Sequence, residues 1–130
     1  MNYREALAYL DLHINVERML GRIDEPSLDR MQRLMAVMGD PQHAYPVIHV
    51  TGTNGKGSTV QIATRLLAEH GLTVATYTSP HLERLNERIS RNGEPIGDEE
   101  LAEMITAVSE LEVLAGITPT WFEIITAAAF

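Results

Sequence analysis

Apolar residues recur at helical spacing in four parts of the chain. The spacing predicts helices over residues 3–12, 27–38, 60–70 and 98–114. Ser27 is a suitable N-cap for the second of these helices, and Gly39 and Gly71 are suitable stops for the second and third. Three acidic residues in the first turn of the fourth helix favour its dipole.

Runs rich in β-branched residues alternate with these helices. Residues 47–50 and 73–78 are predicted as buried strands, with His49 packed in the core. Together with the intervening glycine-rich loop and helix, they form the right-handed unit of a parallel sheet. Residues 79–88 are predicted as a loop, and residues 88–96 as a strand and turn around Asn92-Gly93. The pattern indicates an α/β fold with a parallel sheet and flanking helices.

The last ten residues, 121–130, are apolar on nearly every face. A doubly wound sheet normally has about five or six strands, and only two good parallel strands are found here. We therefore expect the chain to be the N-terminal part of a longer protein. We also expect the final segment to leave apolar surface exposed, with association or partial disorder as the result.

Composition and charge narrow the possible functions. The 130 residues contain no cysteine, which excludes a disulfide scaffold, and no apolar run is long enough to cross a membrane. The first 92 residues are electrically neutral, so the whole net charge of −8 follows Arg91. A chain without a basic patch is unsuited to general binding of nucleic acids or anionic membranes. We expect a cytoplasmic protein that binds any anion with a local device.

That local device is the loop before the third helix. Lys56 is the only lysine of the chain, and glycines 52, 55 and 57 surround it. Successive backbone amides in such a loop form an anion nest, and the following helix directs its positive end at the same point. Lys56 would reach the β- and γ-phosphates, and Ser58 or Thr59 would offer a hydroxyl. The common phosphate-loop pattern differs at Val50 and Gly57, and an ordinary strand-to-helix turn is the alternative.

Several motifs resemble the folate branch of the Mur ligase superfamily, which comprises folylpolyglutamate and dihydrofolate synthases. The similarity covers roughly residues 25–130, in the order of that family. It is carried by Gly52-Thr53-Asn54-Gly55-Lys56-Gly57-Ser58, Tyr77-Thr78-Ser79-Pro80-His81-Leu82, Asn86-Glu87-Arg88-Ile89, Trp121-Phe122-Glu123 with Thr126-Ala127, and, more weakly, Leu28-Asp29-Arg30-Met31.

The resemblance implies an ATP-dependent ligase. Such an enzyme binds MgATP, phosphorylates a carboxylate of folate or dihydropteroate, and joins L-glutamate through the acyl phosphate. Residues 1–130 would be the N-terminal portion of its P-loop domain, and the C-terminal glutamate-binding domain would be absent. The implied ATP-binding residues are Thr53, Asn54, Gly55, Lys56, Gly57, Ser58 and Thr59, with Lys56 also catalytic. The implied Mg²⁺ ligands are Ser79 and Glu123, and the implied substrate contacts are Glu25, Pro26, Ser27, Leu28, Pro80 and His81.

Other interpretations stay open at several of these positions. Ser79 could be a turn serine before proline, and Glu123 could be paired with an arginine such as Arg88. His81 could be a solvated loop residue, and Arg84, Arg88 and Arg91 could form either a solvated face or an attraction for a polyanionic folate tail. Two other functions also remain: a Mur-type ligase for another carboxylate, and a nucleotide- or phosphate-binding module without turnover.

Overall fold

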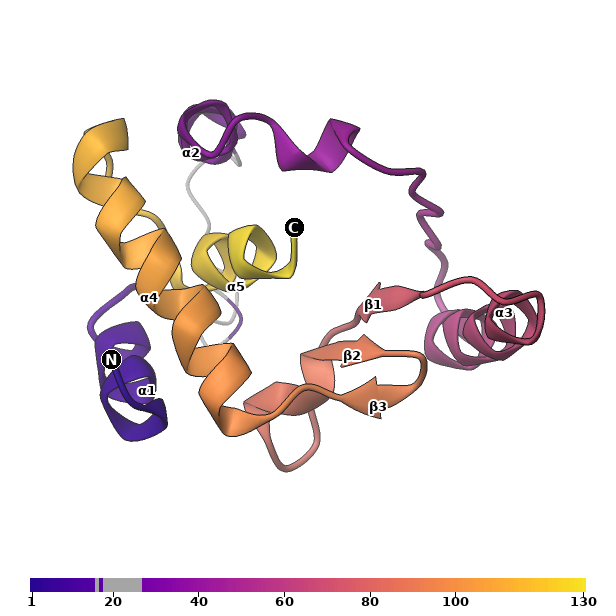
Figure 1. Cartoon of the computed structure of the whole chain (residues 1–130). Coiled ribbons are helices and arrows are strands. Elements are labelled where there is room, and N and C mark those ends of the chain that lie inside the picture. Colours follow the sequence, from indigo (N-terminus) through magenta and orange to yellow (C-terminus); the bar gives the residue numbers. More distant parts are fainter. Residues whose placement is uncertain (16, 18–26) are drawn as a thin grey trace. The chain divides into compact units, whose positions relative to one another are not determined.

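A computed structural model describes residues 1–15, 17 and 27–130, and it divides into two compact units. The first unit contains residues 1–46 and 99–130, and the second contains residues 47–98. The elements labelled in Figure 1 are α1 (Tyr3–Asp11), α2 (Asp29–Val37), η2 (Pro41–His43), α3 (Lys56–Glu69), β1 (Ala75–Tyr77), η3 (Leu85–Arg88), β2 (Ile89–Arg91), β3 (Glu94–Pro95), α4 (Asp98–Ala115) and α5 (Trp121–Ala129). Among the described residues, no helix is both long and apolar enough to span a membrane.

Helix α5 forms the centre of the first unit. Its N-cap is Thr120, whose hydroxyl accepts a hydrogen bond from the Glu123 amide, while the Glu123 carboxylate accepts one from the Thr120 amide. Trp121, Ile124 and Ile125 are buried, because α1 and α2 pack against this helix. The expectation of exposed apolar surface around residues 121–130 was therefore wrong for most of the segment, because a helix that is apolar nearly all round is an interior helix. Only Phe122 and Phe130 of its large apolar side chains are exposed, by 36% and 40%.

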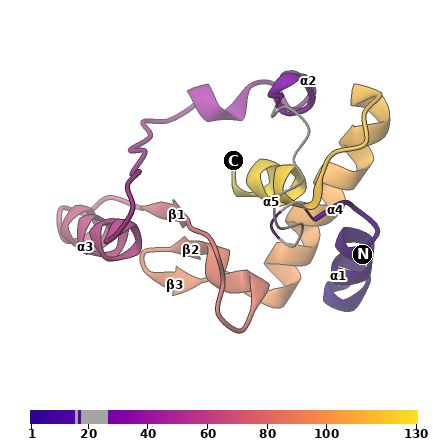
Figure 2. The same ribbon diagram turned by 180° about the vertical axis from the view of Figure 1, so that it is seen from behind.

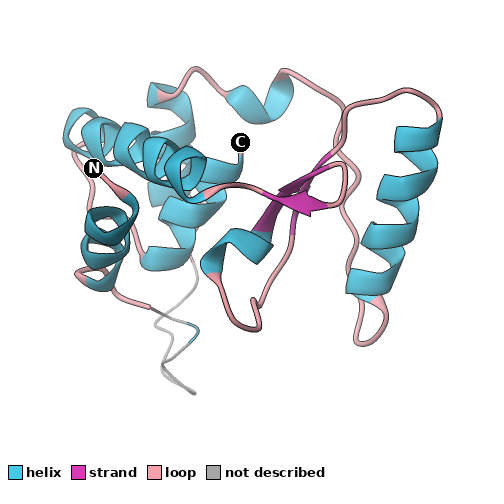
Figure 3. Cartoon of the chain, turned by 60° about the horizontal axis from the view of Figure 1, so that its bottom comes forward, coloured by secondary structure: helices cyan, strands magenta, loops and turns pink. Residues whose placement is uncertain are grey.

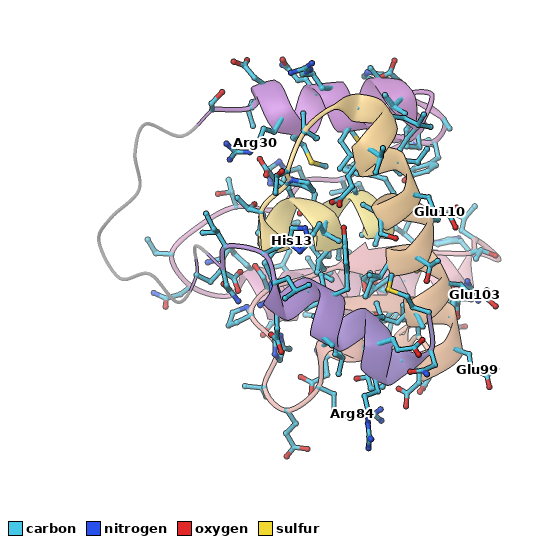
Figure 4. The ribbon with its side chains drawn as sticks, turned by 90° about the vertical axis from the view of Figure 1, so that its left-hand side faces the viewer. His13, Arg30, Arg84, Glu99, Glu103 and Glu110 are labelled. Carbon is cyan, nitrogen blue, oxygen red and sulfur yellow. The ribbon has the colours of Figure 1, made fainter. Side chains whose placement is uncertain are left out.

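Helix α1 is tied to α4 by polar contacts. The Tyr9 hydroxyl donates to Oε2 of Glu112 at 2.7 Å, and Nε2 of His13 lies 3.4 Å from the same oxygen. The N-terminal ammonium of Met1 donates to the Thr106 hydroxyl. These contacts place α1 beside α4, as Figure 2 shows from behind and Figure 4 shows around the labelled His13.

Helix α2 begins two residues later than predicted. Leu28 occupies the N-cap position, and the Ser27 hydroxyl accepts a hydrogen bond from the Asp29 amide at 3.2 Å. Leu34 and Met35 provide the buried face of the helix, whereas Leu28 is 71% exposed. The prediction that Ser27 caps this helix was therefore wrong by one position.

The sheet of the second unit has three antiparallel strands in the order β1-β2-β3 (Figure 3). Ala75 pairs with Arg91 and Tyr77 with Ile89, and Arg91 pairs with Glu94. The turn between β2 and β3 is Asn92-Gly93, and both residues have positive φ, 50° and 88°. A tight hairpin turn of this hand requires such angles, so the predicted strand and turn around Asn92-Gly93 is confirmed.

Residues 47–50 do not form the predicted strand. Val47 and Ile48 are 58% and 70% exposed, and His49 is exposed too, so His49 is not a core histidine. The expected partner, β1, pairs antiparallel with β2 instead, and in the described residues no parallel strand pair is present. A strand without a neighbour has nothing to satisfy its backbone groups, which explains why a β-rich sequence stays irregular here.

Helix α3 begins at Lys56 rather than Val60 and ends at Glu69. Its Ile62 and Leu66 are each 61% exposed, and Leu72 beyond its end is 54% exposed. Large apolar side chains on and around α3 are therefore exposed to solvent. They are Val47, Ile48, Ile62, Leu66 and Leu72 of the second unit. Exposed apolar surface is thus present on the second unit, where the sequence did not predict it.

Candidate nucleotide-binding site

The glycine-rich loop ends in the first turn of α3. Gly55 is the N-cap, with φ 78°, a left-handed conformation that side chains with a Cβ rarely adopt. The first amide of this region to bond within the helix is that of Thr59, which donates to the Gly55 carbonyl at 2.9 Å. The amides of Lys56, Gly57 and Ser58 precede it and therefore lie at the positive end of the helix, where they can bind an anion.

The Lys56 ammonium folds back over this loop and donates a hydrogen bond to the Gly52 carbonyl. An ammonium group has three N–H donors, so this contact orients the side chain while leaving donors for a ligand. Lys56 and its neighbours from residue 51 to residue 59 are all exposed. The only lysine of the chain thus lies at the same exposed helix terminus as the three amides.

The two candidate hydroxyls differ in their surroundings. Thr59 Oγ1 donates to the Gly55 carbonyl at 2.8 Å, so its hydroxyl is used inside the helix. Within the described part of the chain, no hydrogen bond occupies the Ser58 hydroxyl. A Cβ added to Gly57 would meet no atom within 4 Å, so space is open beside the backbone there. Ser58 is therefore the better ligand for an approaching anion or cation.

The loop after β1 holds Ser79 and Pro80 at the surface. Ser79 lies two residues beyond the carboxyl end of β1, and both Ser79 and Pro80 are exposed. The Thr78 amide donates to the Arg88 carbonyl at 2.8 Å, which anchors the start of the loop. Ser79 is thus an accessible hydroxyl on a loop that is fixed at its base.

The rest of this loop is organised by Glu87. Its carboxylate accepts hydrogen bonds from the amides of Leu82, Glu83 and Arg84 at 2.7, 2.9 and 2.7 Å. These amides, that of Leu82 first, lower the pKa of Glu87 because they stabilise its charged form. The carboxylate therefore acts as a local brace for residues 82–84.

His81 is half-buried rather than fully solvated. Its Nδ1 accepts a hydrogen bond from Nε of Arg88 at 2.8 Å. Arg88 is only 2% exposed, so the interpretation of Arg84, Arg88 and Arg91 as a wholly solvated face was wrong at Arg88. Arg84, in contrast, is exposed and forms an ion pair with Asp98. Figure 4 labels Arg84.

Glu123 lies in the first unit, at the start of α5. Its Oε2 accepts from the Thr120 amide at 2.7 Å and from Nε of Arg30 at 3.0 Å. The glutamate is therefore paired with an arginine, but the partner is Arg30 of α2 rather than Arg88. The Glu123 side chain is 13% exposed and that of Arg30 is 45% exposed.

The remaining predicted residues are divided between the units. Ser27 and Leu28 are exposed in the first unit, while Glu25 and Pro26 lie outside the described residues. Thr53 and Asn54 are exposed in the second unit, together with the residues around Lys56. In the described ranges there is no cluster of three or more histidine, aspartate or glutamate side chains that could hold a metal ion.

Two functional candidates were not predicted from the sequence. Arg30 lies in the motif Leu28-Asp29-Arg30-Met31, but the sequence assigned it no function, because its partner Glu123 is 93 residues away. Glu87 had no role either, although its position three residues after Arg84 was a local signal of a carboxylate reaching back to a turn.

The chain is similar to folylpolyglutamate and dihydrofolate synthases in both sequence and fold. It is 47% identical over 110 residues to dihydrofolate synthase/folylpolyglutamate synthase of Bacillus subtilis, which covers 82% of this chain and 26% of that protein. It superposes with a TM-score of 0.83 and 33% identity on Mycobacterium tuberculosis folylpolyglutamate synthase complexed with ADP, covering 98% of this chain and 28% of that one. It also superposes, with a TM-score of 0.79 and 38% identity, on the protein of a solved FPGS-AMPPCP-folate complex, in which FPGS stands for folylpolyglutamate synthase. This match covers 99% of this chain and 31% of that one.

The solved structures confirm the fold, and the relatives confirm the sequence similarity expected from the motifs. No family model matches the chain. The chain spans 26%, 28% and 31% of the length of these three proteins. The α/β fold of the Mur ligase type is confirmed by the solved structures, even though residues 47–50 are not a strand here. Over most of its length, this chain is similar in sequence and in fold to one segment of the proteins of the folylpolyglutamate synthase and dihydrofolate synthase family.

Proposed function

We propose that the full-length protein containing this chain is an ATP-dependent ligase that adds L-glutamate to folate or dihydropteroate. In this reaction a substrate carboxylate oxygen attacks the γ-phosphorus, ADP leaves, and the glutamate amine displaces phosphate from the acyl phosphate to form an amide. The observation that carries the proposal is the exposed N-terminus of α3, where Lys56 lies beside the amides of Gly57 and Ser58. A relative of similar sequence and fold is complexed with ADP.

In this proposal the loop and α3 hold the triphosphate. The ligand groups are backbone amides of residues 55–58, the ammonium group of Lys56 and the hydroxyl of Ser58. Thr53 and Asn54 line the preceding turn, and Thr59 closes the first helical turn. Phosphoryl transfer depends mainly on positioning and on stabilising charge, so a fixed lysine and converging amides are suitable groups. The Lys56–Gly52 contact keeps the amine near the loop before nucleotide arrives.

We propose Ser79, in the second unit, and Glu123, in the first unit, each as a candidate protein ligand for Mg²⁺. The donor set fits this ion, since Mg²⁺ takes oxygen ligands and is usually held by one or two protein groups together with phosphates and waters. Ser79 is an exposed hydroxyl, and Glu123 keeps Oε1 without a hydrogen-bond partner among the described residues. When bound, Mg²⁺ offsets the charge of the phosphates.

We assign contacts with the folate or dihydropteroate substrate to Ser27 and Leu28 of the first unit and, separately, to Pro80 and His81 of the second unit. Glu25 and Pro26, which are assigned the same role, lie outside the described residues. Leu28 and Pro80 are exposed apolar groups suited to contact with a flat ring. His81 is held in place by Arg88, whose Nε donates a hydrogen bond to Nδ1 of the imidazole ring. A solved FPGS-AMPPCP-folate complex supports this class of substrate.

The chain by itself is also a candidate for nucleotide binding without turnover. The observation that favours this second function is the length of the chain, which spans 26% of the Bacillus subtilis relative and 31% of the chain in the AMPPCP-folate complex. A Mur-type ligase acting on another carboxylate is the remaining alternative, and the folate-type loop around Ser79 argues against it.

The test measures binding and turnover side by side. Isothermal titration with MgATP and phosphate release in the presence of substrates are followed for residues 1–130 and for the full-length protein. We expect phosphate release and glutamate incorporation with folate or dihydropteroate in the full-length protein only. A substrate panel in which a cell-wall precursor is used and folates are not would refute the proposed specificity.

A further inference from the structure

Two helices of the first unit are joined by one ion pair. Nε of Arg30, in the first turn of α2, lies 3.0 Å from Oε2 of Glu123, in the first turn of α5. The residues are 93 positions apart, so only the tertiary fold brings them together. Arg30 is labelled in Figure 4, where its side chain extends from α2.

The contacts of Glu123 are concentrated on one carboxylate oxygen. Oε2 accepts from Arg30 and from the Thr120 amide, the latter at 2.7 Å. Thr120 in turn accepts from the Glu123 amide, so the backbone of the residue is held as well. Oε1 has no hydrogen-bond partner among the described residues. The carboxylate cannot turn about its terminal bond without breaking both contacts of Oε2.

We infer that Arg30 is a positioning residue that holds Glu123 with Oε1 directed away from its protein partners and available to a divalent cation. The inference rests on the proposed function, in which Glu123 is a ligand of Mg²⁺. Carboxylates that ligate metals are themselves hydrogen-bonded, and these outer contacts fix their orientation. Arg30 and the Thr120 amide are such contacts, and they use the oxygen that the cation does not.

An opposite effect of Arg30 also follows from its charge. A guanidinium repels a nearby cation and neutralises the carboxylate that should attract it. The Arg30 side chain is 45% exposed, so water screens this repulsion, and its hydrogen bond goes to Oε2 rather than to Oε1. Orientation therefore outweighs repulsion, and removal of Arg30 weakens cation binding rather than strengthening it.

The experiment is a Mn²⁺ titration of the full-length protein saturated with AMPPCP, with free Mn²⁺ measured by electron paramagnetic resonance. The variants are Arg30→Gln, Arg30→Lys, Glu123→Gln and the control Arg33→Gln, which changes an exposed arginine of the same helix. We expect Arg30→Gln to weaken Mn²⁺ binding about 10-fold to 100-fold. Arg30→Lys should lie between Arg30→Gln and the wild type, and Arg33→Gln should match the wild type.

The outcomes separate this inference from the proposed function. Unchanged or tighter Mn²⁺ binding in Arg30→Gln, with weaker binding in Glu123→Gln, overturns the positioning role and leaves the metal site in place. Unchanged binding in Glu123→Gln overturns both. If circular dichroism shows that Arg30→Gln does not fold, Arg30→Lys decides, because an amine cannot donate from the position of Nε. Wild-type affinity in Arg30→Lys would then overturn the role.

Discussion

Nε of the buried Arg88 donates a hydrogen bond to Nδ1 of His81 at 2.8 Å. The contact joins the last residue of η3 to the loop that follows β1, and the Arg88 carbonyl also accepts from the Thr78 amide. One residue therefore anchors this loop at two points, through its side chain and through its backbone.

Replacing Arg88 should destabilise the second unit. In Arg88→Met the backbone contact to Thr78 remains, but His81 loses a charged donor in a buried environment. We expect the free energy of unfolding to fall by about 1.5–3 kcal/mol, the range for hydrogen bonds to charged groups. Urea titration followed by circular dichroism measures this change. The control Arg65→Met alters an exposed arginine of α3 and should change stability by less than about 0.5 kcal/mol. Equal effects of the two substitutions would contradict the anchoring role.

The brace formed by Glu87 should depend on pH. Its pKa is lowered in the folded state by the amides of Leu82, Arg84 and Glu83, so its stabilising effect is present above the unfolded pKa of glutamate, about 4.3. The effect is lost as pH falls through the lower, folded pKa. The difference in urea midpoint between the wild type and Glu87→Gln should therefore be largest near neutral pH and should shrink in acid. A difference that stays constant down to pH 3 would argue against the amide contacts as its cause.

A methyl group at Gly57 should separate ligand binding from folding. Outside its chain neighbours and the backbone of its own helix, a Cβ there meets no protein atom within 4 Å, and Gly57 lies in the first turn of α3 without a positive φ. Gly57→Ala should thus keep or raise the free energy of unfolding, by at most about 1 kcal/mol from helix propensity. The methyl group would occupy the space that we assign to phosphate, so MgATP affinity of the full-length protein should fall.

Gly97→Ala is the matched control for this substitution. Gly97 also has open space around its Cβ position and no positive φ, but it lies just before α4 and is not part of the loop around Lys56. Isothermal titration should show wild-type MgATP affinity in Gly97→Ala. Equal affinities in Gly57→Ala and the wild type would place the phosphate elsewhere.

The parts of the fold that the sequence predicted well are those with local causes. The spacing of apolar residues predicted α1 and α4 nearly to their ends, and Asn92-Gly93 predicted the hairpin turn because both residues accept positive φ. Residues 47–50 were predicted wrongly because a strand depends on a partner, and β1 pairs with β2. Helix α5 was missed because its residues are apolar nearly all round and show no polar face.

The candidate site shows the same division. The loop around Lys56 could be predicted because glycines, lysine and helix start are adjacent in sequence. The pairing of Glu123 with Arg30 could not, since arginines are frequent in this chain and only packing of α2 against α5 selects one of them. The sequence also could not decide between the hydroxyls of Ser58 and Thr59, because either side chain can bond back to its own helix. In the structure Thr59 does so, which leaves Ser58 as the available hydroxyl.

We propose that Lys56 and the first amides of α3 bind the triphosphate of ATP. The most direct measurement is isothermal titration of MgATP into the full-length Lys56→Ala protein, together with glutamate incorporation on the same sample. Lys56 is exposed, and among the described residues its ammonium group bonds to the Gly52 carbonyl alone, so the fold should persist, as circular dichroism would check. We predict that nucleotide affinity falls and that glutamate incorporation is abolished. A folded variant with unchanged MgATP affinity and turnover would show that Lys56 does not bind the triphosphate.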